Sequence, residues 1–304
     1  MSNNANINWY PGHMAKTKKQ IMQDLSMIDV VVELLDARIP VASRNPDIQE
    51  MTKNKKRLII LNKCDLADEE ETKKWVSYFE KQGIPAIATD ANTGAGIKNL
   101  IPKVEALMEE EKKKQSEKGR VGRAIRMMIL GIPNVGKSSL INRLSKKVTA
   151  KVGNKPGVTV AKQWIRIGQT IELLDTPGVL WPKFENEEIA FHLAYTGTIK
   201  DEILERTEIA FSLLRYLLTE YKEIVIERYH LEKEVVDEML ENQAQDSNAN
   251  IYDIMQLIGK KRGAIIAGGR VDDEKTSAIL LDDFRTGKLG RITVEKVPKN
   301  EVKK

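Results

Sequence analysis

Several features that stabilise or anchor other classes of protein are scarce in this chain of 304 residues. It has a single cysteine, Cys64, so no internal disulfide can form, and aromatic residues make up only 5%. The first residues are polar, and no stretch approaches the ~20 apolar residues that a membrane-spanning helix needs. These absences argue against a disulfide scaffold and a membrane protein. We expect a cytoplasmic protein whose fold rests on packing.

Negative charge is absent from one long segment. Between Lys118 and Ile171 there is no Asp or Glu, although the net charge of the whole chain is only +5. The basic residues of this segment are Lys118, Arg120, Arg123, Arg126, Lys137, Arg143, Lys146, Lys147, Lys151, Lys155, Lys162 and Arg166. A field of one sign attracts polyanions, and one nucleotide would use only part of it. The alternative is a solvated surface whose charge is balanced by acidic residues folded nearby.

The stretch from Gly131 to Ser138 fits the phosphate-loop pattern G-x-x-x-x-G-K-[ST] and follows the apolar run Ile125 to Leu130. Its glycines let the backbone turn tightly and aim N–H groups at phosphate oxygens. Lys137 would reach the outer phosphates, and the Ser138 hydroxyl would ligate Mg²⁺. The residues expected to hold the phosphates are Asn134, Val135, Gly136, Lys137, Ser138 and Ser139.

Two further polar elements follow the phosphate loop in the sequence. Asp175 and Gly178 form a D-x-x-G pattern at the end of an apolar segment. The carboxylate could hold a Mg²⁺-bound water and the glycine N–H could meet the γ-phosphate, but a strand-terminal turn has the same pattern. Thr159 lies in the basic loop and could give Mg²⁺ a second hydroxyl ligand.

The tetrapeptide Asn62-Lys63-Cys64-Asp65 indicates which base is bound. The Asp65 carboxylate can accept two parallel hydrogen bonds from guanine N1–H and N2–H₂, whereas adenine offers no such pair. Lys63 would lay its aliphatic stem along the base. The alternative for these four residues alone is an exposed turn.

Apolar segments that suit buried strands alternate with helical patterns in the first part of the chain. The predicted strands are Met27–Leu35, Leu58–Leu61, Ile84–Ala88, Ile125–Leu130, Gln163–Ile167 and Thr170–Leu174, and the helices include Asp68–Gln82 and Ile97–Lys114. The polar motifs follow strands, which favours an α/β fold with a mostly parallel sheet and a ligand at the carboxyl ends of the strands. From about Glu185 the pattern is helical. We therefore expect a nucleotide-binding domain over residues 1–184 and an all-α domain over residues 185–304.

The order of the motifs resembles a circularly permuted GTPase. Ordinary GTPases begin with the phosphate loop, whereas this chain runs Asn62–Asp65, Thr89-Asp90-Ala91, Gly131–Ser138, Thr159 and Asp175–Gly178. With Trp9–Lys16, Asp36–Pro40 and Gly268–Asp272, the pattern resembles the bacterial ribosome biogenesis GTPase A family over nearly the whole chain. In the base-backing loop, Asp90 stands where many GTPases have serine. We expect the Ala91 N–H to meet the guanine oxygen there.

The resemblance implies a P-loop GTPase that binds GTP and GDP with Mg²⁺ and drives a late step of large (50S) ribosomal subunit assembly. Its partners would be the large subunit and its rRNA, with neither DNA nor a membrane, and the particle would stimulate hydrolysis. Low aromatic content predicts RNA recognition through shape and backbone. Two other functions are considered: a small-molecule kinase, and a signalling or trafficking switch with protein partners only.

The hydrolytic machinery is incomplete in the sequence. Many GTPases carry a water-orienting glutamine directly after the D-x-x-G glycine, whereas this chain has Val179, which cannot orient water. The family resemblance implies His13 as the catalytic group, brought in on the ribosome; a residue that stabilises the Pro11-Gly12 turn is the alternative. It also implies Asn134 as a ligand for K⁺. An RNA group is the third candidate.

Overall fold

The computed structural model describes residues 12–117, 123–146, 164–174, 186–199, 205–241 and 247–298. The chain divides into two compact units. The first contains residues 1–185 together with 295–304, and the second contains residues 186–294. The helical unit therefore differs from the expected domain at its end, because the last residues of the chain group with the first unit.

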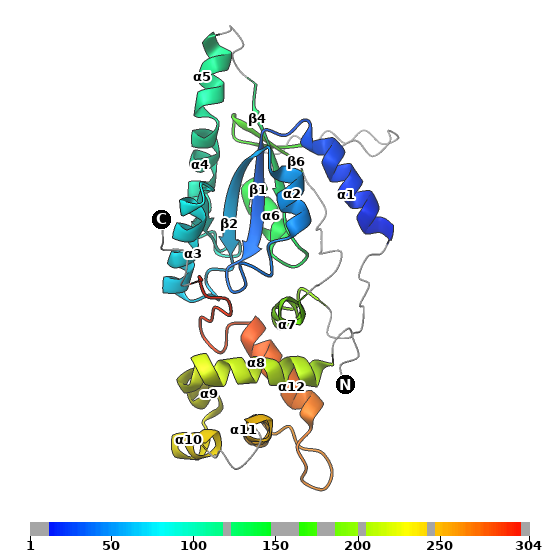
Figure 1. Cartoon of the computed structure of the whole chain (residues 1–304), viewed down its shortest axis with the longest axis vertical. Helices are drawn as coiled ribbons and strands as arrows, with labels where there is room; N and C mark the ends of the chain where they lie inside the picture. Colours follow the sequence, from blue (N-terminus) through cyan, green and yellow to red (C-terminus); the bar gives the residue numbers. More distant parts are fainter. Residues whose placement is uncertain are drawn as a thin grey trace. The chain divides into compact units, whose positions relative to one another are not determined.

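The first unit is built on a six-stranded sheet in the order β3-β2-β1-β4-β6-β5 (Figure 1). Its strands are β1 (Val30–Asp36), β2 (Lys56–Asn62), β3 (Ala86–Ala88), β4 (Ile125–Leu130), β5 (Trp164–Ile167) and β6 (Ile171–Leu174). Neighbouring strands are parallel except β5 and β6, which form an antiparallel hairpin. The mostly parallel α/β sheet expected from the sequence is confirmed.

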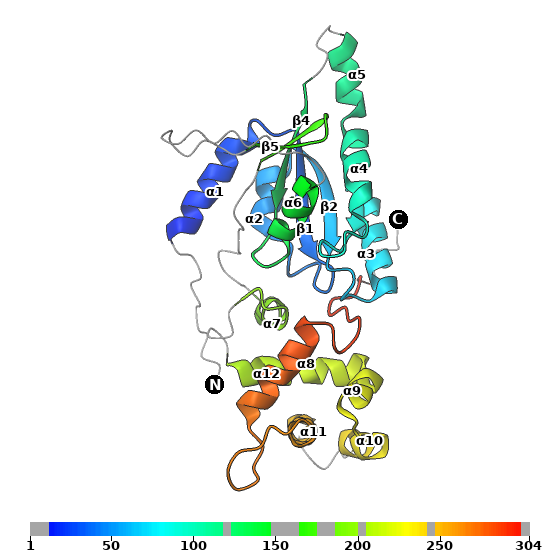
Figure 2. The same ribbon diagram turned by 180° about the vertical axis from the view of Figure 1, so that it is seen from behind.

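Helices cover both faces of this sheet, which is why its central strands consist almost entirely of apolar residues. The helices are α1 (Gly12–Leu25), α2 (Pro46–Thr52), α3 (Glu69–Lys81), α4 (Leu100–Leu107), α5 (Glu109–Glu117) and α6 (Lys137–Lys146). Helices α2 and α6 lie on opposite faces of the sheet (Figures 1 and 2). On one face Val31 packs with Ile21 of α1 and Ile48 of α2, and Leu35 packs with Trp75 of α3.

The structure differs from the sequence analysis at two helices. The helix predicted over Ile97–Lys114 is interrupted: a 3₁₀ turn, Ile97–Asn99, precedes α4, and Met108 separates α4 from α5. Helix α2 was not predicted from the sequence. In the structure the Asn45 side chain caps the helix by accepting a hydrogen bond from Asp47 N, and Pro46 occupies the first turn, where its missing N–H costs nothing.

Helices are the regular secondary structure of the second unit's described residues, apart from an isolated bridge between Ile265 and Val271. Its helices are α7 (Glu187–Tyr195), α8 (Arg206–Glu220), α9 (Lys222–Tyr229), α10 (Lys233–Glu241), α11 (Ser247–Lys261) and α12 (Asp273–Arg285). Helix α8 packs against α12 and α11. Arg228 of α9 pairs with the buried Asp283 of α12 through two 3.0 Å hydrogen bonds, which fixes these helices to each other.

The last described segment, residues 295–298, is part of the first unit. The Glu295 carboxylate accepts hydrogen bonds from the main-chain N–H groups of Val41 at 2.5 Å and Ala42 at 3.1 Å. The indole N–H of Trp75 donates to the Glu295 carbonyl oxygen at 2.8 Å. Through these contacts the end of the chain holds the loop that follows β1.

Candidate nucleotide-binding site

Three of the predicted motifs meet at one edge of the sheet. The Asn62–Asp65 tetrapeptide begins at the last residue of β2, the Thr89-Asp90-Ala91 loop follows β3, and the phosphate loop follows β4. These strands are parallel members of one sheet, so their carboxyl ends lie along the same edge. This is where ligands bind in open α/β sheets.

The phosphate loop connects β4 to α6 and presents the first turn of the helix. Lys137 donates hydrogen bonds from Nζ to the carbonyl oxygens of Gly131 at 3.0 Å and Ile132 at 2.7 Å, so its ammonium closes the loop on itself. Gly136 has a φ of +101°, and a Cβ there would lie 2.3 Å from Asn62 Nδ2. A side chain at this position is therefore excluded both by backbone conformation and by space.

The outward-facing residues of this loop are polar. Asn134, Ser138 and Ser139 are exposed, whereas Val135 is buried and anchors the loop from below. Asn134 has a positive φ of 59°, uncommon for a residue with a side chain. The loop thus presents an amide and two hydroxyl groups at a helix N-terminus, where main-chain N–H groups favour anions.

Asn62 joins all three motifs although its side chain is only 2% exposed. Its Nδ2 donates to the Val135 carbonyl oxygen at 2.8 Å, which ties β2 to the phosphate loop. Its Oδ1 accepts from Thr89 Oγ1 at 3.1 Å and from Ala91 N at 3.0 Å, which ties β2 to the loop after β3. Cys64, the third residue of the tetrapeptide, is half-buried and donates its N–H to the Thr89 carbonyl oxygen at 3.1 Å.

The Asp90 side chain shapes the base-backing loop. Its carboxylate accepts hydrogen bonds from Asn92 N at 2.7 Å and Thr93 N at 3.1 Å, and also from the Thr93 hydroxyl. Asp90 is buried and closes the turn with both of its carboxylate oxygens, whereas a serine has one side-chain oxygen and could accept only some of these hydrogen bonds. The Ala91 N–H, expected at the guanine oxygen, donates in this structure to the Asn62 side chain.

Asp65 lies exposed beside this loop. Partial burial and the negative charge of nearby Asp90 raise the pKa of the Asp65 carboxyl above its ordinary value. Hydrogen-bond donors, such as the N–H groups of a guanine edge, would therefore stabilise the ionised Asp65 carboxylate against the repulsion from Asp90.

A buried charge cluster stands next to the tetrapeptide, and the sequence interpretation missed its role. Lys63 Nζ lies 3.0 Å from Asp36 Oδ2, and Arg38 binds the same carboxylate through Nε at 3.0 Å and Nη2 at 2.8 Å. Both Asp36 and Arg38 are 1% exposed. The signal in the sequence was an acid and a base at the end of a largely apolar strand.

Several predicted site residues lie outside the described part of the chain. These are Thr159, Asp175, Gly178 and the side chain of His13, whose backbone lies in α1. Among the described residues, no three His, Cys, Asp or Glu side chains come together as a metal site, and no helix is both long and apolar enough to cross a bilayer. The exposed hydroxyl of Ser138, in the first turn of α6, is an oxygen of the kind that Mg²⁺ binds.

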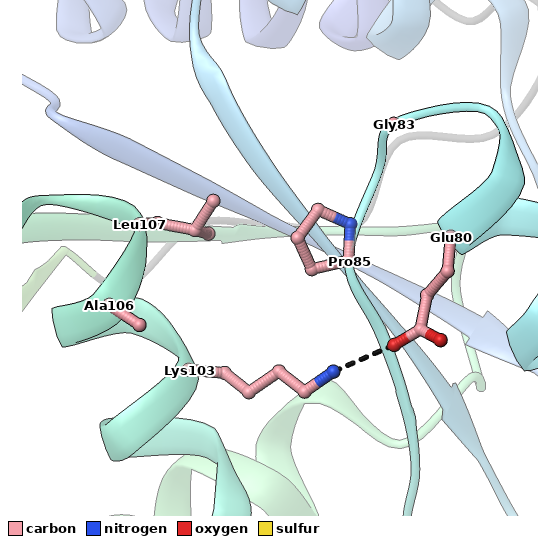
Figure 3. Close-up of a pocket in the computed structure, with 6 residues that line it drawn as sticks. All are labelled: Glu80, Gly83, Pro85, Lys103, Ala106 and Leu107. Atoms are coloured by element: carbon pink, nitrogen blue, oxygen red, sulfur yellow. Dashed lines mark hydrogen bonds and ion pairs between the residues drawn. The ribbon is translucent and has the colours of Figure 1, made fainter.

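The surface hollow shown in Figure 3 is not this site. It has a volume of about 400 Å³ and is lined by Glu80, Gly83, Pro85, Lys103, Ala106 and Leu107. Lys103 and Glu80 form an ion pair across it at 2.8 Å. Its residues lie on α3, on α4 and before the amino end of β3, whereas the motifs follow the carboxyl ends of the strands.

Comparison with known proteins decides the family. A protein from Bacillus cereus described as ribosome biogenesis GTPase A is 47% identical over 289 residues, which cover 95% of this chain and 93% of that protein. The chain belongs to the ribosome biogenesis GTPase A family. A relative with the same description from Thermotoga maritima is 31% identical over 95% of this chain and 94% of that protein. The family described as 50S ribosome-binding GTPase matches residues 126–257, and the RsgA GTPase family matches residues 48–185.

Solved structures agree with this assignment. GNP-bound YlqF from T. maritima superposes with a TM-score of 0.62 at 28% identity, covering 92% of this chain and 98% of that one. A GDP-bound structure of TM YlqF gives a TM-score of 0.63, also at 28% identity, covering 91% of this chain and 98% of that one. The chain is thus a GTP hydrolase with a circularly permuted P-loop fold and a helical C-terminal region, and GTPases of this family generally use Mg²⁺. The family also argues against a small-molecule kinase.

Proposed function

We propose that this GTPase binds GTP and GDP at the carboxyl edge of its parallel sheet and uses hydrolysis to drive a late step of 50S subunit assembly. The observation that supports the site best is the position of Asn62, which links the tetrapeptide, the base-backing loop and the phosphate loop through one buried side chain. Guanine recognition belongs to Asp65 and the stem of Lys63. The proposed nucleotide-binding residues are Asn62, Lys63, Cys64, Asp65, Asp90, Ala91, Asn134, Val135, Gly136, Lys137, Ser138, Ser139, Thr159, Asp175 and Gly178.

The proposed roles around the phosphates follow from side-chain chemistry. Ser138 and Thr159 supply hydroxyl ligands to Mg²⁺, which neutralises charge on the phosphates. The exposed Asn134 amide oxygen is suited to a monovalent cation such as K⁺. Because Val179 cannot orient water, hydrolysis by the free protein should be slow. His13, K⁺ or an RNA group on the particle would supply what is missing.

Large subunits and their rRNA are the proposed partners. The support is the acid-free basic segment from Lys118 to Ile171 and the name of the family that matches residues 126–257. Acting on ribosomal particles would place the protein in the cytoplasm, with neither DNA nor a membrane as a partner. A signalling or trafficking switch with protein partners only is the alternative, and the family name argues against it.

The test is co-sedimentation of the protein with purified 50S subunits, in a non-hydrolysable GTP analogue and in GDP. We expect more protein in the pellet with the analogue, and binding that weakens steeply as salt rises, because phosphate contacts release counterions. Equal binding with both nucleotides would contradict a GTP-driven step. Binding of a partner that resists both salt and RNase would favour the protein-only switch.

A further inference from the structure

The buried carboxylate of Asp36 is placed between the two main parts of the proposed guanine nucleotide site. Asp36 is the last residue of β1, and β1 lies between β2, which leads into the tetrapeptide, and β4, which leads into the phosphate loop. In the sheet register, Asp36 is paired with Asn62. The Ala37 N–H donates to the Asn62 carbonyl oxygen at 2.8 Å, so the two strand ends are also joined by their backbones.

This carboxylate holds two cations at once. Asp36 Oδ1 accepts from Arg38 Nε at 3.0 Å and from Arg38 N at 3.0 Å, while Oδ2 accepts from Arg38 Nη2 at 2.8 Å and lies 3.0 Å from Lys63 Nζ. Burial alone would raise the pKa of Asp36, but the two cations overcome this and hold it well below its ordinary range. The carboxylate is therefore ionised at neutral pH and offers Lys63 a counter-charge.

We propose that Asp36 is a positioning residue of the guanine site, which fixes the Lys63 side chain across the base position before the nucleotide arrives. A lysine stem has four rotatable bonds, and ordering it when the nucleotide binds costs conformational entropy. A side chain that is already held in the free protein avoids this cost at the binding step. The backbone of Lys63 is also held in one conformation. Lys63 has a φ of +58°, strained for a residue with a side chain, and its carbonyl oxygen accepts from Leu66 N at 3.0 Å.

Arg38 holds the Asp36 carboxylate in a fixed orientation next to Lys63. Its guanidinium occupies one side of the carboxylate in bidentate geometry, which leaves Oδ2 able to face the lysine ammonium. The loop that carries Arg38 is closed by Ser43, whose hydroxyl accepts from Asp36 N at 3.0 Å and donates to the Ile39 carbonyl oxygen at 2.7 Å. The Asp36 backbone is thus fixed by Ser43. Its carboxylate binds Arg38 through both oxygens and Lys63 through Oδ2.

The inference rests on the proposed guanine site and can be tested on the full-length protein with Asp36→Asn. The amide keeps the shape but places either a donor or a neutral oxygen towards Lys63. We expect binding of a fluorescent GDP analogue to weaken about tenfold, in line with coupling between contacting residues. The KM for GTP should rise by the same factor while kcat stays close to that of the wild type.

Glu33→Gln is the matched control, because Glu33 is another buried carboxylate of β1, paired with Arg44 at 3.5 Å and without contact to Lys63. Both variants should lower the melting temperature, but only Asp36→Asn should weaken GDP binding. In a Lys63→Met background, Asp36→Asn should cause no further loss of affinity. If Asp36→Asn binds GDP like Glu33→Gln does, or weakens it equally in the Lys63→Met background, the positioning role is wrong.

Asp65→Asn separates this inference from the site itself. Loss of GDP binding in Asp65→Asn with normal binding in Asp36→Asn would leave the site in place and overturn only the role of Asp36. Normal binding in both would overturn the site. If Asp36→Asn fails to fold, acetylation of wild-type lysines followed by mass spectrometry gives the answer. Lys63 should react more slowly than the exposed Lys98 even without nucleotide, and equal rates would contradict preorganisation.

Discussion

The side-chain amide of Asn62 donates a hydrogen bond to the carbonyl oxygen of Val135 at 2.8 Å. These residues are far apart in the sequence, and the bond connects the end of β2 to the phosphate loop. The other side of the same amide accepts from the loop after β3. One buried side chain therefore sets the spacing between the loop proposed to hold the base and the loop proposed to hold the phosphates.

Asn62→Asp should break the connection between β2 and the phosphate loop while keeping the one to the loop after β3. A carboxylate keeps the acceptor for Thr89 and Ala91 but turns an oxygen towards the Val135 carbonyl oxygen, so a donor is replaced by a repulsive contact. We expect a loss of stability of about 1–3 kcal/mol and weaker GDP binding. Chemical denaturation and nucleotide titration measure the two effects. The exposed Asn99→Asp is the control, and equal behaviour of the two variants would contradict the bridging role.

Asp65→Asn should change the base that the protein accepts. Xanthine carries an oxygen where guanine carries its N2 amine, so an asparagine could accept from N1–H and donate to that oxygen. We expect weaker binding of GDP and stronger binding of XDP than in the wild type, measured by competition. Asp68→Asn is the matched control. Asp68 caps α3 by accepting from Glu71 N at 2.9 Å, and asparagine caps a helix equally well.

The affinity for GDP should fall on acidification sooner than an ordinary carboxyl would predict. Burial and the charge of Asp90 raise the pKa of Asp65, and only the ionised carboxylate accepts both guanine donors. Affinity is therefore full above this raised pKa and is lost as the pH falls through it. GDP titrations across acidic pH measure the midpoint. The dependence should disappear in Asp65→Asn, and an unchanged profile there would assign the titration to another group.

Glu295→Ala should destabilise the first unit although the residue lies beyond the helical unit in the sequence. The substitution removes the acceptor for the Val41 and Ala42 N–H groups, which also loosens the loop after β1. We expect a loss of about 1–3 kcal/mol in the free energy of unfolding. Denaturation followed by the fluorescence of Trp75, which donates to the Glu295 carbonyl oxygen, reports this region. The exposed Lys296→Ala should have a much smaller effect.

The sequence predicted the sheet well because its strands are buried on both faces and therefore consist of apolar runs between polar motifs. Asn62, Lys137 and Ser138 were predicted as site residues because phosphate and guanine recognition require particular residues at short, fixed spacings, and the structure brings their motifs to one edge of the sheet. The break at Met108 could not be predicted, since the residues around it are all compatible with one continuous helix. Only the packed fold distinguishes the two arrangements.

The contacts of Asp36 and Glu295 were missed for a different reason. Each depends on residues that the fold brings together from separate parts of the chain, and neither side of the contact forms a recognisable pattern. The predicted strand stopped at Leu35, one residue before Asp36, although Asp36 ends β1 and pairs with Lys63. Nothing in the tail around Glu295 indicated that it returns to the first unit.

The grouping of residues 295–298 with the first unit has a consequence for folding during synthesis. A chain is synthesised from its N-terminus, so the sheet and its motifs leave the ribosome before the whole helical unit is made. The Glu295 contacts with the loop after β1 can form only after the whole helical unit has been synthesised. Until then that loop, which carries Arg38 next to the buried Asp36, lacks the two hydrogen bonds to Glu295, so the first unit is completed only after the helical unit has been made.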